Sequence, residues 1–287
     1  MGTAWIALNF APVQEVWDSL HPALGLAKSL RRNDALLPIL WGLNAHVITT
    51  GRVAESLGGV AQMLDAAELY HDGDLLIVGH ASAAVTNFYL GELMKTREHA
   101  GKVLALYTEE RHGPMVGLLN QDLKTFTLTW MALSTWMLGY PEQAVKISDA
   151  ALAHARRLGH PFNLSWCLTY GAMVFDHVGE PEELLKHVEE GERVARENSL
   201  RFVKEVLARS HVGVALIRKG EFTAGVASLK AGRTIWENGG GRLGVHLKSV
   251  LAEGRAQLGA LDGALDLIGE IIAQIERPGL GRTALLC

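Results

Sequence analysis

Cysteine is scarce in this chain of 287 residues, which contains only Cys167 and Cys287. Two cysteines this far apart form neither a disulfide framework nor the CxxC half of a metal site. Cys167 stands in an apolar helical stretch, where a cysteine is a small core residue with an unreactive thiol. Free thiols suit a reducing compartment, so we expect a cytoplasmic protein.

An excess of either charge is also missing, because 27 Lys and Arg face 31 Asp and Glu. This balance excludes the basic footprint of a nucleic-acid-binding protein, and we expect no nucleic-acid partner. Two uncharged stretches, residues 75–91 and 125–141, lie at the lower limit of length for crossing a bilayer, about 17 residues. Polar residues interrupt both stretches, so we predict no membrane insertion.

The motifs of common enzymes are absent from the sequence. It has no GxxxxGKS/T phosphate loop and no HExxH metal motif. His71, Asp72 and Asp74 are close together, but a turn and a helix N-cap explain them better than a cation site. The glycine-rich run at 238–242 indicates a flexible link rather than an anion site. We therefore expect a non-enzyme with no catalytic residue, cofactor or metal.

Glycine, by contrast, is abundant and recurs at a regular interval of roughly 40 residues. Each recurrence lies between two amphipathic segments, where glycine can take the left-handed conformation that ends a helix. Proline shortly after the turn, at Pro141 and Pro181, suits the first turn of the following helix. These turns are predicted at Gly51, Gly91, Gly139, Gly179, Gly220 and Gly259.

Small residues recur at fixed distances from these glycines, as closely packed helix pairs require. Five of the six residues that lie seven positions before a turn glycine are Ala or Gly; the set is Asn44, Ala84, Ala132, Ala172, Gly213 and Ala252. Five of the six that lie five positions after it are small; the set is Ser56, Thr96, Ala144, Leu184, Gly225 and Ala264. A third such position, on the second helix, is weaker. The tetratricopeptide pattern has small residues at these positions, although its usual period of about 34 residues is shorter.

The sequence therefore predicts an all-α fold, a right-handed solenoid of about seven tetratricopeptide-like helix hairpins. A loop at 108–121 and an irregular tail at 278–287 complete the chain. The loop is either a binding insertion on one face of the solenoid or a capped connection with Asp122 as helix N-cap. The units are predicted at 1–31, 34–71, 74–107, 122–158, 161–198, 200–237 and 242–277.

Several segments resemble one bacterial regulatory family. They are LLPILWGL at 36–43, YTEERH at 107–112, Gln121-Asp122, TWMLGYPEQA at 135–144, RRLGHPFNLSW at 156–166 and ERPG at 276–279. They look like the tetratricopeptide-like C-terminal region of multidomain signalling proteins, which often carry a class III adenylate/guanylate cyclase domain and an AAA-type or STAND-type ATPase. Related repeats occur in LuxR-type transcription regulators. The resemblance implies a sensory or regulatory arm. A fragment of such a cyclase or of a LuxR-type regulator stays as the alternative.

We accordingly predict a non-catalytic module whose concave groove, lined by first helices, binds a protein segment or small effector. Arg111 and His112 are candidate binding residues, because arginine offers forked donors and histidine titrates near neutral pH. Gln121 and Asp122 complete the candidate site. We also expect self-association through exposed solenoid ends. The seven tryptophans fit either core packing or the concave surface, and the sequence leaves both open.

Overall fold

The computed structural model describes residues 14–30, 32–200, 207–238 and 243–276, and these residues form helices joined by short turns without any strand. An all-α solenoid is confirmed. The first helices of the hairpins are α3 (Asn33–Thr49), α5 (Gly73–Leu90), α9 (Leu123–Met137), α11 (Pro161–Val178), η2 (Leu207–His211) with α14 (Val212–Arg218), and α16 (Leu243–Gln257). The second helices are α2 (Gln14–Ser29), α4 (Val53–Tyr70), α6 (Leu93–Leu106), α10 (Pro141–Leu158), α12 (Pro181–Glu197), α15 (Phe222–Asn238) and α17 (Leu261–Ile275).

One turn geometry reverses the chain inside each hairpin. All six turn glycines have φ between +79° and +88°, the left-handed region that glycine occupies at little cost. In each turn the glycine N–H and the next N–H bond back to carbonyls of the last helical turn. At Gly139 these distances are 2.8 Å to the oxygen of Trp136 and, from Tyr140, 3.1 Å to that of Thr135. This Schellman arrangement satisfies carbonyls that the helix end would leave unpaired.

The two helices of a hairpin approach closely at the predicted small positions. A Cβ atom added to Gly225 of α15 would lie 2.9 Å from the carbonyl oxygen of Gly213 on α14. In the α3–α4 hairpin polar residues stand there instead, and the Ser56 hydroxyl donates to the Asn44 side-chain oxygen over 2.5 Å. The Thr86 hydroxyl of α5 lies 2.6 Å from the Ser56 oxygen and extends this buried chain of hydrogen bonds.

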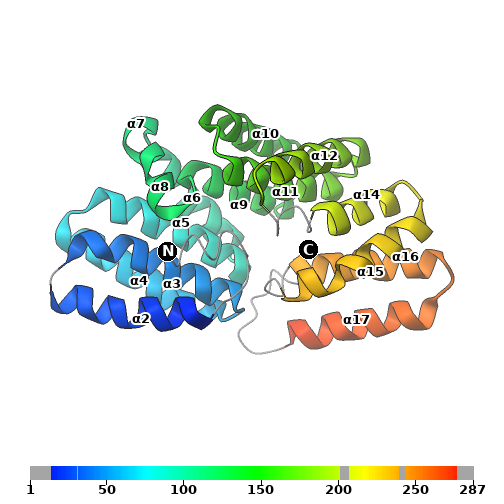
Figure 1. Cartoon of the computed structure of the whole chain (residues 1–287), viewed down its shortest axis with the longest axis horizontal. Helices are drawn as coiled ribbons and strands as arrows, with labels where there is room; N and C mark the ends of the chain where they lie inside the picture. The colour runs from blue at the N-terminus through cyan, green and yellow to red at the C-terminus, as the bar shows by residue number, and fades with distance from the viewer. Residues whose placement is uncertain (1–13, 31, 201–206, 239–242, 277–287) are drawn as a thin grey trace.

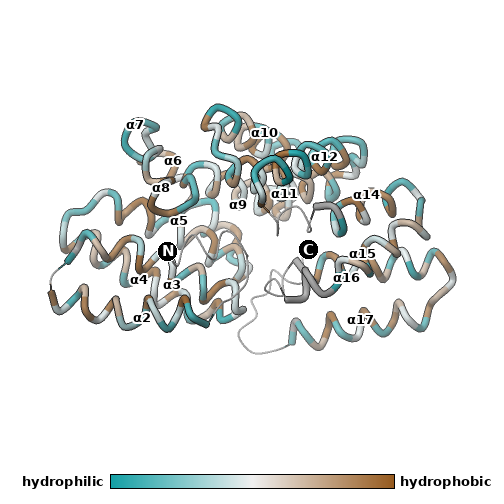
Figure 2. The backbone as a smooth tube through the Cα atoms, in the orientation of Figure 1, coloured by the Kyte–Doolittle hydropathy of each residue, from teal (hydrophilic) through white to brown (hydrophobic). Residues whose placement is uncertain are grey.

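The hairpins stack so that first helices contact one another along the solenoid: α3 with α5, then α9, α11, α14 and α16 in turn. From α4 to α15, each second helix packs on the first helix of its own unit and on that of the next unit, while α2 packs on α3 and α17 packs on α16. The first helices therefore form the inner layer. The row of hairpins curves from α2 through α9–α12 to α17 (Figure 1). Figure 2 shows hydrophilic turns on α10 and α12, which belong to the outer layer.

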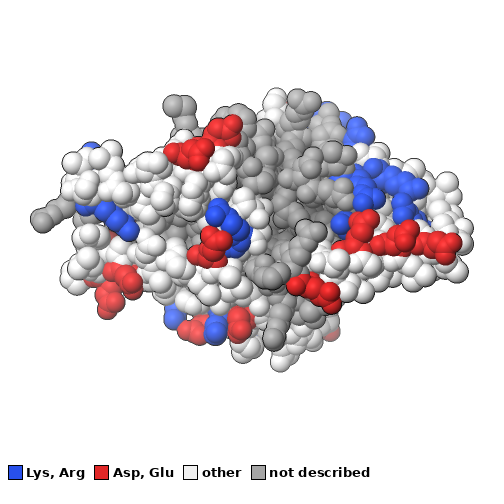
Figure 3. All heavy atoms as spheres, turned by 90° about the horizontal axis from the view of Figure 1, so that it is seen from below, with Lys and Arg blue, Asp and Glu red and all other residues white. Residues whose placement is uncertain are grey.

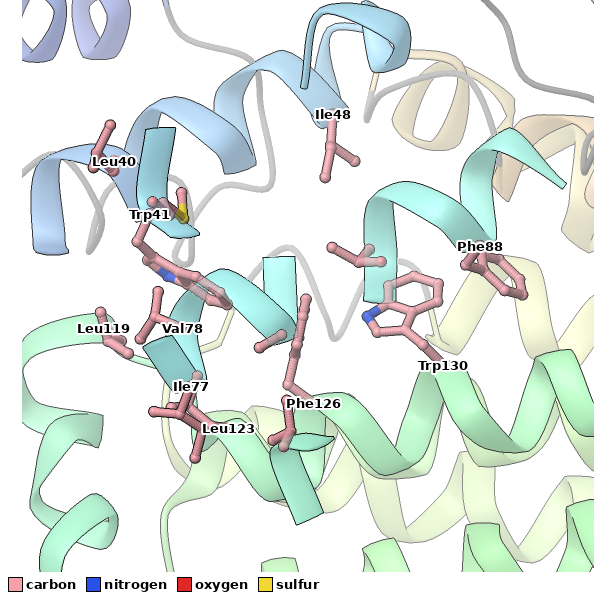
Figure 4. Close-up of a cluster of buried hydrophobic side chains, with 14 of the residues drawn as sticks. Leu40, Trp41, Ile48, Ile77, Val78, Phe88, Leu119, Leu123, Phe126 and Trp130 are labelled. Carbon is pink, nitrogen blue, oxygen red and sulfur yellow. The ribbon is translucent and has the colours of Figure 1, made fainter. Parts of the chain in front are cut away.

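The largest core lies where first helices meet in the N-terminal half. Aromatic rings interlock across three of them, with Trp41 of α3 at 5.2 Å from Phe126 of α9, and Phe88 of α5 at 5.0 Å from Trp130 (ring centroids; Figure 4). Aliphatic side chains fill the space between these rings. Close packing of this kind fixes the position of each first helix relative to its neighbours.

The connection at 108–121, which the sequence predicts as a loop, is partly helical. It contains three short helical pieces, α7 (Glu109–His112), η1 (Gly113–Met115) and α8 (Val116–Leu119). Helix α8 contacts α3, and Leu119 joins the core (Figure 4). The segment ends at Asn120 with φ of 56°, a left-handed residue that turns the chain into α9. Because its apolar residue is buried, this segment is part of the packed structure.

The first helix of the sixth unit is not a regular α-helix throughout its described residues. Residues 207–211 form a π-helical turn, η2, before α14 begins. Residues 1–13, 31, 201–206, 239–242 and 277–287 lie outside the described residues, and so do the first helix of the first predicted hairpin and the predicted tail. Among the described residues, no helix combines the length and apolar character needed to span a bilayer.

The last described helix has one charged and one apolar face. Acidic and basic side chains run side by side over the α15–α17 end of the molecule (Figure 3), and Glu270 pairs with Arg233 at 3.1 Å and Lys248 at 3.2 Å. Leucine and isoleucine side chains at helical spacing stay exposed on α17; they are Leu261, Leu265, Ile268 and Ile272. Self-association through such an end stays a prediction.

The close approach of α14 and α15 generates a stability prediction. We expect Gly225→Ala to lower the free energy of unfolding by about 1–3 kcal/mol, because the new methyl would meet Ile217 and the Gly213 carbonyl oxygen. Gly269→Ala on α17 is the matched control, since nothing lies within 4 Å of its added Cβ. The control should raise stability by up to about 1 kcal/mol. Urea unfolding measures both, and equal effects would contradict the close-packed interface.

Candidate functional site

Asp122 is the centre of a buried polar network where the long connection enters α9. Its carboxylate caps the helix by accepting the Thr125 N–H at 2.7 Å, and it accepts the Tyr107 hydroxyl at 2.7 Å. The His154 Nε2 atom of α10 lies 3.2 Å from the same carboxylate. The Asp122 N–H donates to the Asn163 side-chain oxygen of α11 over 2.8 Å. One residue thus joins the end of α6 to three further helices.

The protonation states in this network follow from its hydrogen bonds. Burial alone would raise the pKa of Asp122, but hydrogen bonds from His154, Thr125 and Tyr107 outweigh it and hold the pKa below its usual value. Burial and the bond to Asp122 raise the pKa of the Tyr107 hydroxyl, which therefore stays a donor. Arg157 donates to His154 Nδ1 over 3.1 Å, so His154 Nε2 carries the proton that faces Asp122.

The other predicted binding residues lie beside this network. Arg111 is exposed and pairs with Asp74, Nε to Oδ1 at 2.8 Å, which ties α7 to the start of α5. His112 is buried, and its Nδ1 accepts the Thr108 N–H over 2.9 Å. Gln121 is buried with no hydrogen-bond partner at its Nε2 atom. Arg111 alone of the four offers its charged group to solvent, and ligand binding by this set stays a prediction.

A structural role for the connection predicts unequal effects of two substitutions. Asp122→Ala should lower the free energy of unfolding by about 2–4 kcal/mol, because it removes a helix cap and leaves the half-buried Tyr107 and the buried His154 without their acceptor. Arg111→Ala, the comparison variant, should leave the unfolding midpoint unchanged, since its ion pair lies in solvent. Chemical denaturation followed by circular dichroism measures both. Equal midpoints for the two variants would be evidence against the network.

A second polar group, which we name the inner cluster, consists of Asp176, His177, Arg218, His246 and Glu253. It joins three successive first helices, α11, α14 and α16. Buried Asp176 accepts from Arg218 Nε at 2.5 Å and lies 3.1 Å from His246 Nε2. Arg218 also pairs with Glu253, Nη1 to Oε2 at 2.6 Å, and both of these side chains reach solvent. A charged group thus lies on the inner layer of the solenoid.

An aromatic side chain from a fourth first helix adjoins the inner cluster. Trp136 of α9 stacks on His177 with ring centroids 4.1 Å apart and an angle of 16° between the planes. Burial lowers the pKa of His177 to about 4, with a further contribution from His246. Burial would raise the pKa of Asp176, but His246 and Arg218 hold it well below its usual range. At neutral pH the cluster therefore contains an ionised Asp176 beside a neutral His177.

Sequence reasoning missed the inner cluster because its members come from three different units. One signal was present: His177 and Arg218 occupy the same register, two residues before turn glycines Gly179 and Gly220. Equivalent positions in stacked repeats line up along one face. Asp176, His177 and His246 are also metal-ligand types, and their donor atoms all lie within 4.8 Å of one another. The sequence predicted no metal ligands, because no local motif connects these residues.

A histidine pair inside the third hairpin is a further titratable group. His80 of α5 and His99 of α6 face each other with their Nδ1 atoms 3.0 Å apart. Burial lowers the pKa of His80 to about 4, and the neighbouring His99 and Lys102 lower it further in the same direction. Burial likewise lowers the pKa of His99. Because one ring must accept from the other, the pair is stable only when it is not fully protonated.

This pair predicts an acid-sensitive stability. An unfolded histidine has a pKa of about 6.5, so the unfolded chain binds more protons than the folded chain between about pH 6.5 and 4. The free energy of unfolding should be highest above pH 6.5 and should fall by roughly 1–2 kcal/mol as the pH drops to 4. His80→Leu should make this slope shallower, while other histidines with a lowered pKa, such as His177, keep part of it; urea unfolding across that range measures the change. A variant slope as steep as the wild-type slope would rule out this pair as its source.

The stacked hairpins define an all-α solenoid of the tetratricopeptide-like kind. The chain is similar to a Rap protein complexed with Competence and Sporulation Factor, with a TM-score of 0.64, 14% identity, and coverage of 95% of this chain and 74% of that chain. It is also similar to BtubC (BKLC) from P. vanneervenii, with a TM-score of 0.53, 14% identity, and coverage of 78% and 89%. At this level of identity the likeness shows the fold alone.

A Signal Transduction ATPase with Numerous Domains (STAND) protein with a tetratricopeptide repeat sensor, from Pyrococcus horikoshii, matches at a TM-score of 0.49 and 12% identity. That match covers 87% of this chain and 38% of the ATPase chain. No protein-family model matches the sequence, and no curated protein matches it.

Proposed function

We propose that this chain is a non-catalytic helical-repeat module that binds a short protein segment on the inner layer of its C-terminal half. The inner cluster is the observation that supports this proposal. It places an arginine and a glutamate, both partly in solvent, beside a tryptophan–histidine stack. Forked arginine donors and aromatic faces are the groups that recognise protein segments.

The extent of this surface suits a protein segment better than a small molecule. Four first helices contribute to it: α9, α11, α14 and α16. Packed helices lie about 8–10 Å apart, so four of them span roughly 30 Å. An extended segment of about nine residues covers that distance. The Rap protein that shares this fold was crystallised with Competence and Sporulation Factor, which supports partner binding by analogy.

The chemistry of the described residues supports a binding role over catalysis. Cys167 is buried, and burial raises the pKa of its thiol far above the usual value, so it is a poor nucleophile. The charged groups of the inner cluster pair with one another. Such pairs can exchange partners with a charged ligand at the solvent-facing side, where Arg218 and Glu253 lie.

We further propose that the module is the regulatory arm of a bacterial signalling protein. The resemblance of residues 107–166 to repeat regions beside cyclase or ATPase domains supports this role. A ligand across four first helices would fix the angles between successive hairpins, because each unit contacts only its neighbours. A partner domain at one end of the solenoid would sense that change. The connection before α9 contains the four predicted binding residues, Arg111, His112, Gln121 and Asp122. A change in the angles between hairpins would reach this connection through α9 and α11.

Peptide binding to the full chain tests the proposed surface. Decapeptides selected from a randomised display library should bind the wild type, and Arg218→Gln should weaken that binding about tenfold, or about 1.4 kcal/mol. Arg156→Gln is the matched control, because Arg156 forms a similar Arg–Glu pair with Glu190 on the second helices. Fluorescence polarisation measures the affinities, and thermal unfolding checks that each variant is folded. Peptides that lose affinity equally with both variants would place binding elsewhere.

A further inference from the structure

The inner cluster contains a set of side chains with the chemistry and spacing of metal ligands. Asp176 and His177 end α11, and His246 lies in the first turns of α16. One carboxylate oxygen and one nitrogen from each imidazole lie within 4.8 Å of one another. The distance from Asp176 Oδ2 to His246 Nε2, 3.1 Å, is close to the edge of a tetrahedron around an ion with ligands at about 2.0–2.1 Å.

Two of these donor atoms lack hydrogen-bond geometry although they are buried. His177 Nε2 has no hydrogen-bond partner, and Asp176 Oδ2 has none beyond its ion-pair contact with His246. The Asp176 side chain is 1% exposed. A buried polar atom without a partner costs about 1–3 kcal/mol, so such atoms point to a missing ligand.

The surroundings hold the donors in place for a cation. Arg218 bonds Asp176 Oδ1, which directs the other oxygen, Oδ2, toward the two histidines. Trp136 stacks on the His177 ring and fixes its plane. Glu253 offsets the charge of Arg218, so one negative charge remains from the three groups. In metal sites, hydrogen-bonding and packing partners of this kind orient the side chains that bind the ion.

We propose that Asp176, His177 and His246 form a site for one divalent transition-metal ion of the zinc and cobalt class. Two imidazoles and a carboxylate suit such an ion, and a fourth position stays open to water or to a ligand atom. The ion would tie α11 directly to α16 across the intervening α14. The site does not depend on the peptide-binding proposal, because it needs no occupant of the inner layer other than the metal.

Cobalt binding tests this site on the full chain. After treatment with EDTA, the wild type should take up one Co²⁺ per chain and show the intense visible absorption of tetrahedral coordination. His177→Gln should weaken Co²⁺ binding at least about tenfold, the size of effect seen when metal-site partners are removed. His21→Gln is the control for adventitious surface binding, since His21 is exposed on α2, and it should bind as the wild type does.

A second measurement keeps the test decisive if a variant folds poorly. Zn²⁺ added to the wild type should raise the thermal midpoint in a concentration-dependent way, because an ion that binds only the folded chain stabilises it. Absence of tetrahedral Co²⁺ absorption in the wild type, or absorption that persists in His177→Gln and His246→Gln, would overturn the proposal. Either result would leave the peptide-binding measurements unaffected, so the two proposals fail separately.

Discussion

The whole structure depends on one local event, the reversal of the chain after each first helix. A single left-handed glycine ends the helix, and two hydrogen bonds close its last turn. The reversal brings the second helix back along the first. The two helices then lie so close together that only small or hydrogen-bonded side chains fit where they cross. Between α14 and α15 both crossing residues, Gly213 and Gly225, lack a side chain. Because the same reversal recurs in each unit, each hairpin presents equivalent faces to its neighbours, and the stack follows.

Two places in the solenoid depart from this pattern of small residues and short turns. In the α3–α4 hairpin the crossing is made by Asn44 and Ser56, whose hydrogen bond satisfies both buried groups. Where the connection before α9 is longer, the buried network around Asp122 holds the neighbouring helices together. A polar crossing or connection can therefore be buried where hydrogen bonds satisfy its members. Asp122 and His112 are enclosed in this way, whereas Gln121 is buried although its Nε2 atom has no partner.

The sequence could predict whatever repeats or acts locally. The turn glycines, the small crossing residues and the alternation of first and second helices are periodic, and the N-cap at Asp122 lies beside the helix that it starts. The contact of Tyr107 with His154, and that of Asp176 with Arg218 and His246, join distant units, and no local pattern encodes them. The short helices at 109–119 escaped prediction because Gly113-Pro114 interrupts any helical periodicity there.

The inner cluster is hard to explain by stability alone. Among α3, α5 and α9 the first helices join through apolar and aromatic contacts, such as Trp41 with Phe126. At the junction of α11, α14 and α16, a carboxylate, a guanidinium and two imidazoles occupy that place instead. Apolar side chains of similar volume commonly stabilise a junction as well as a buried ion pair, or better, because charges lose their hydration. Functional sites are where such electrostatic arrangements concentrate, and this one faces the layer that a ligand would reach. Recognition of a ligand or a metal ion therefore explains the charged residues at this junction better than packing does.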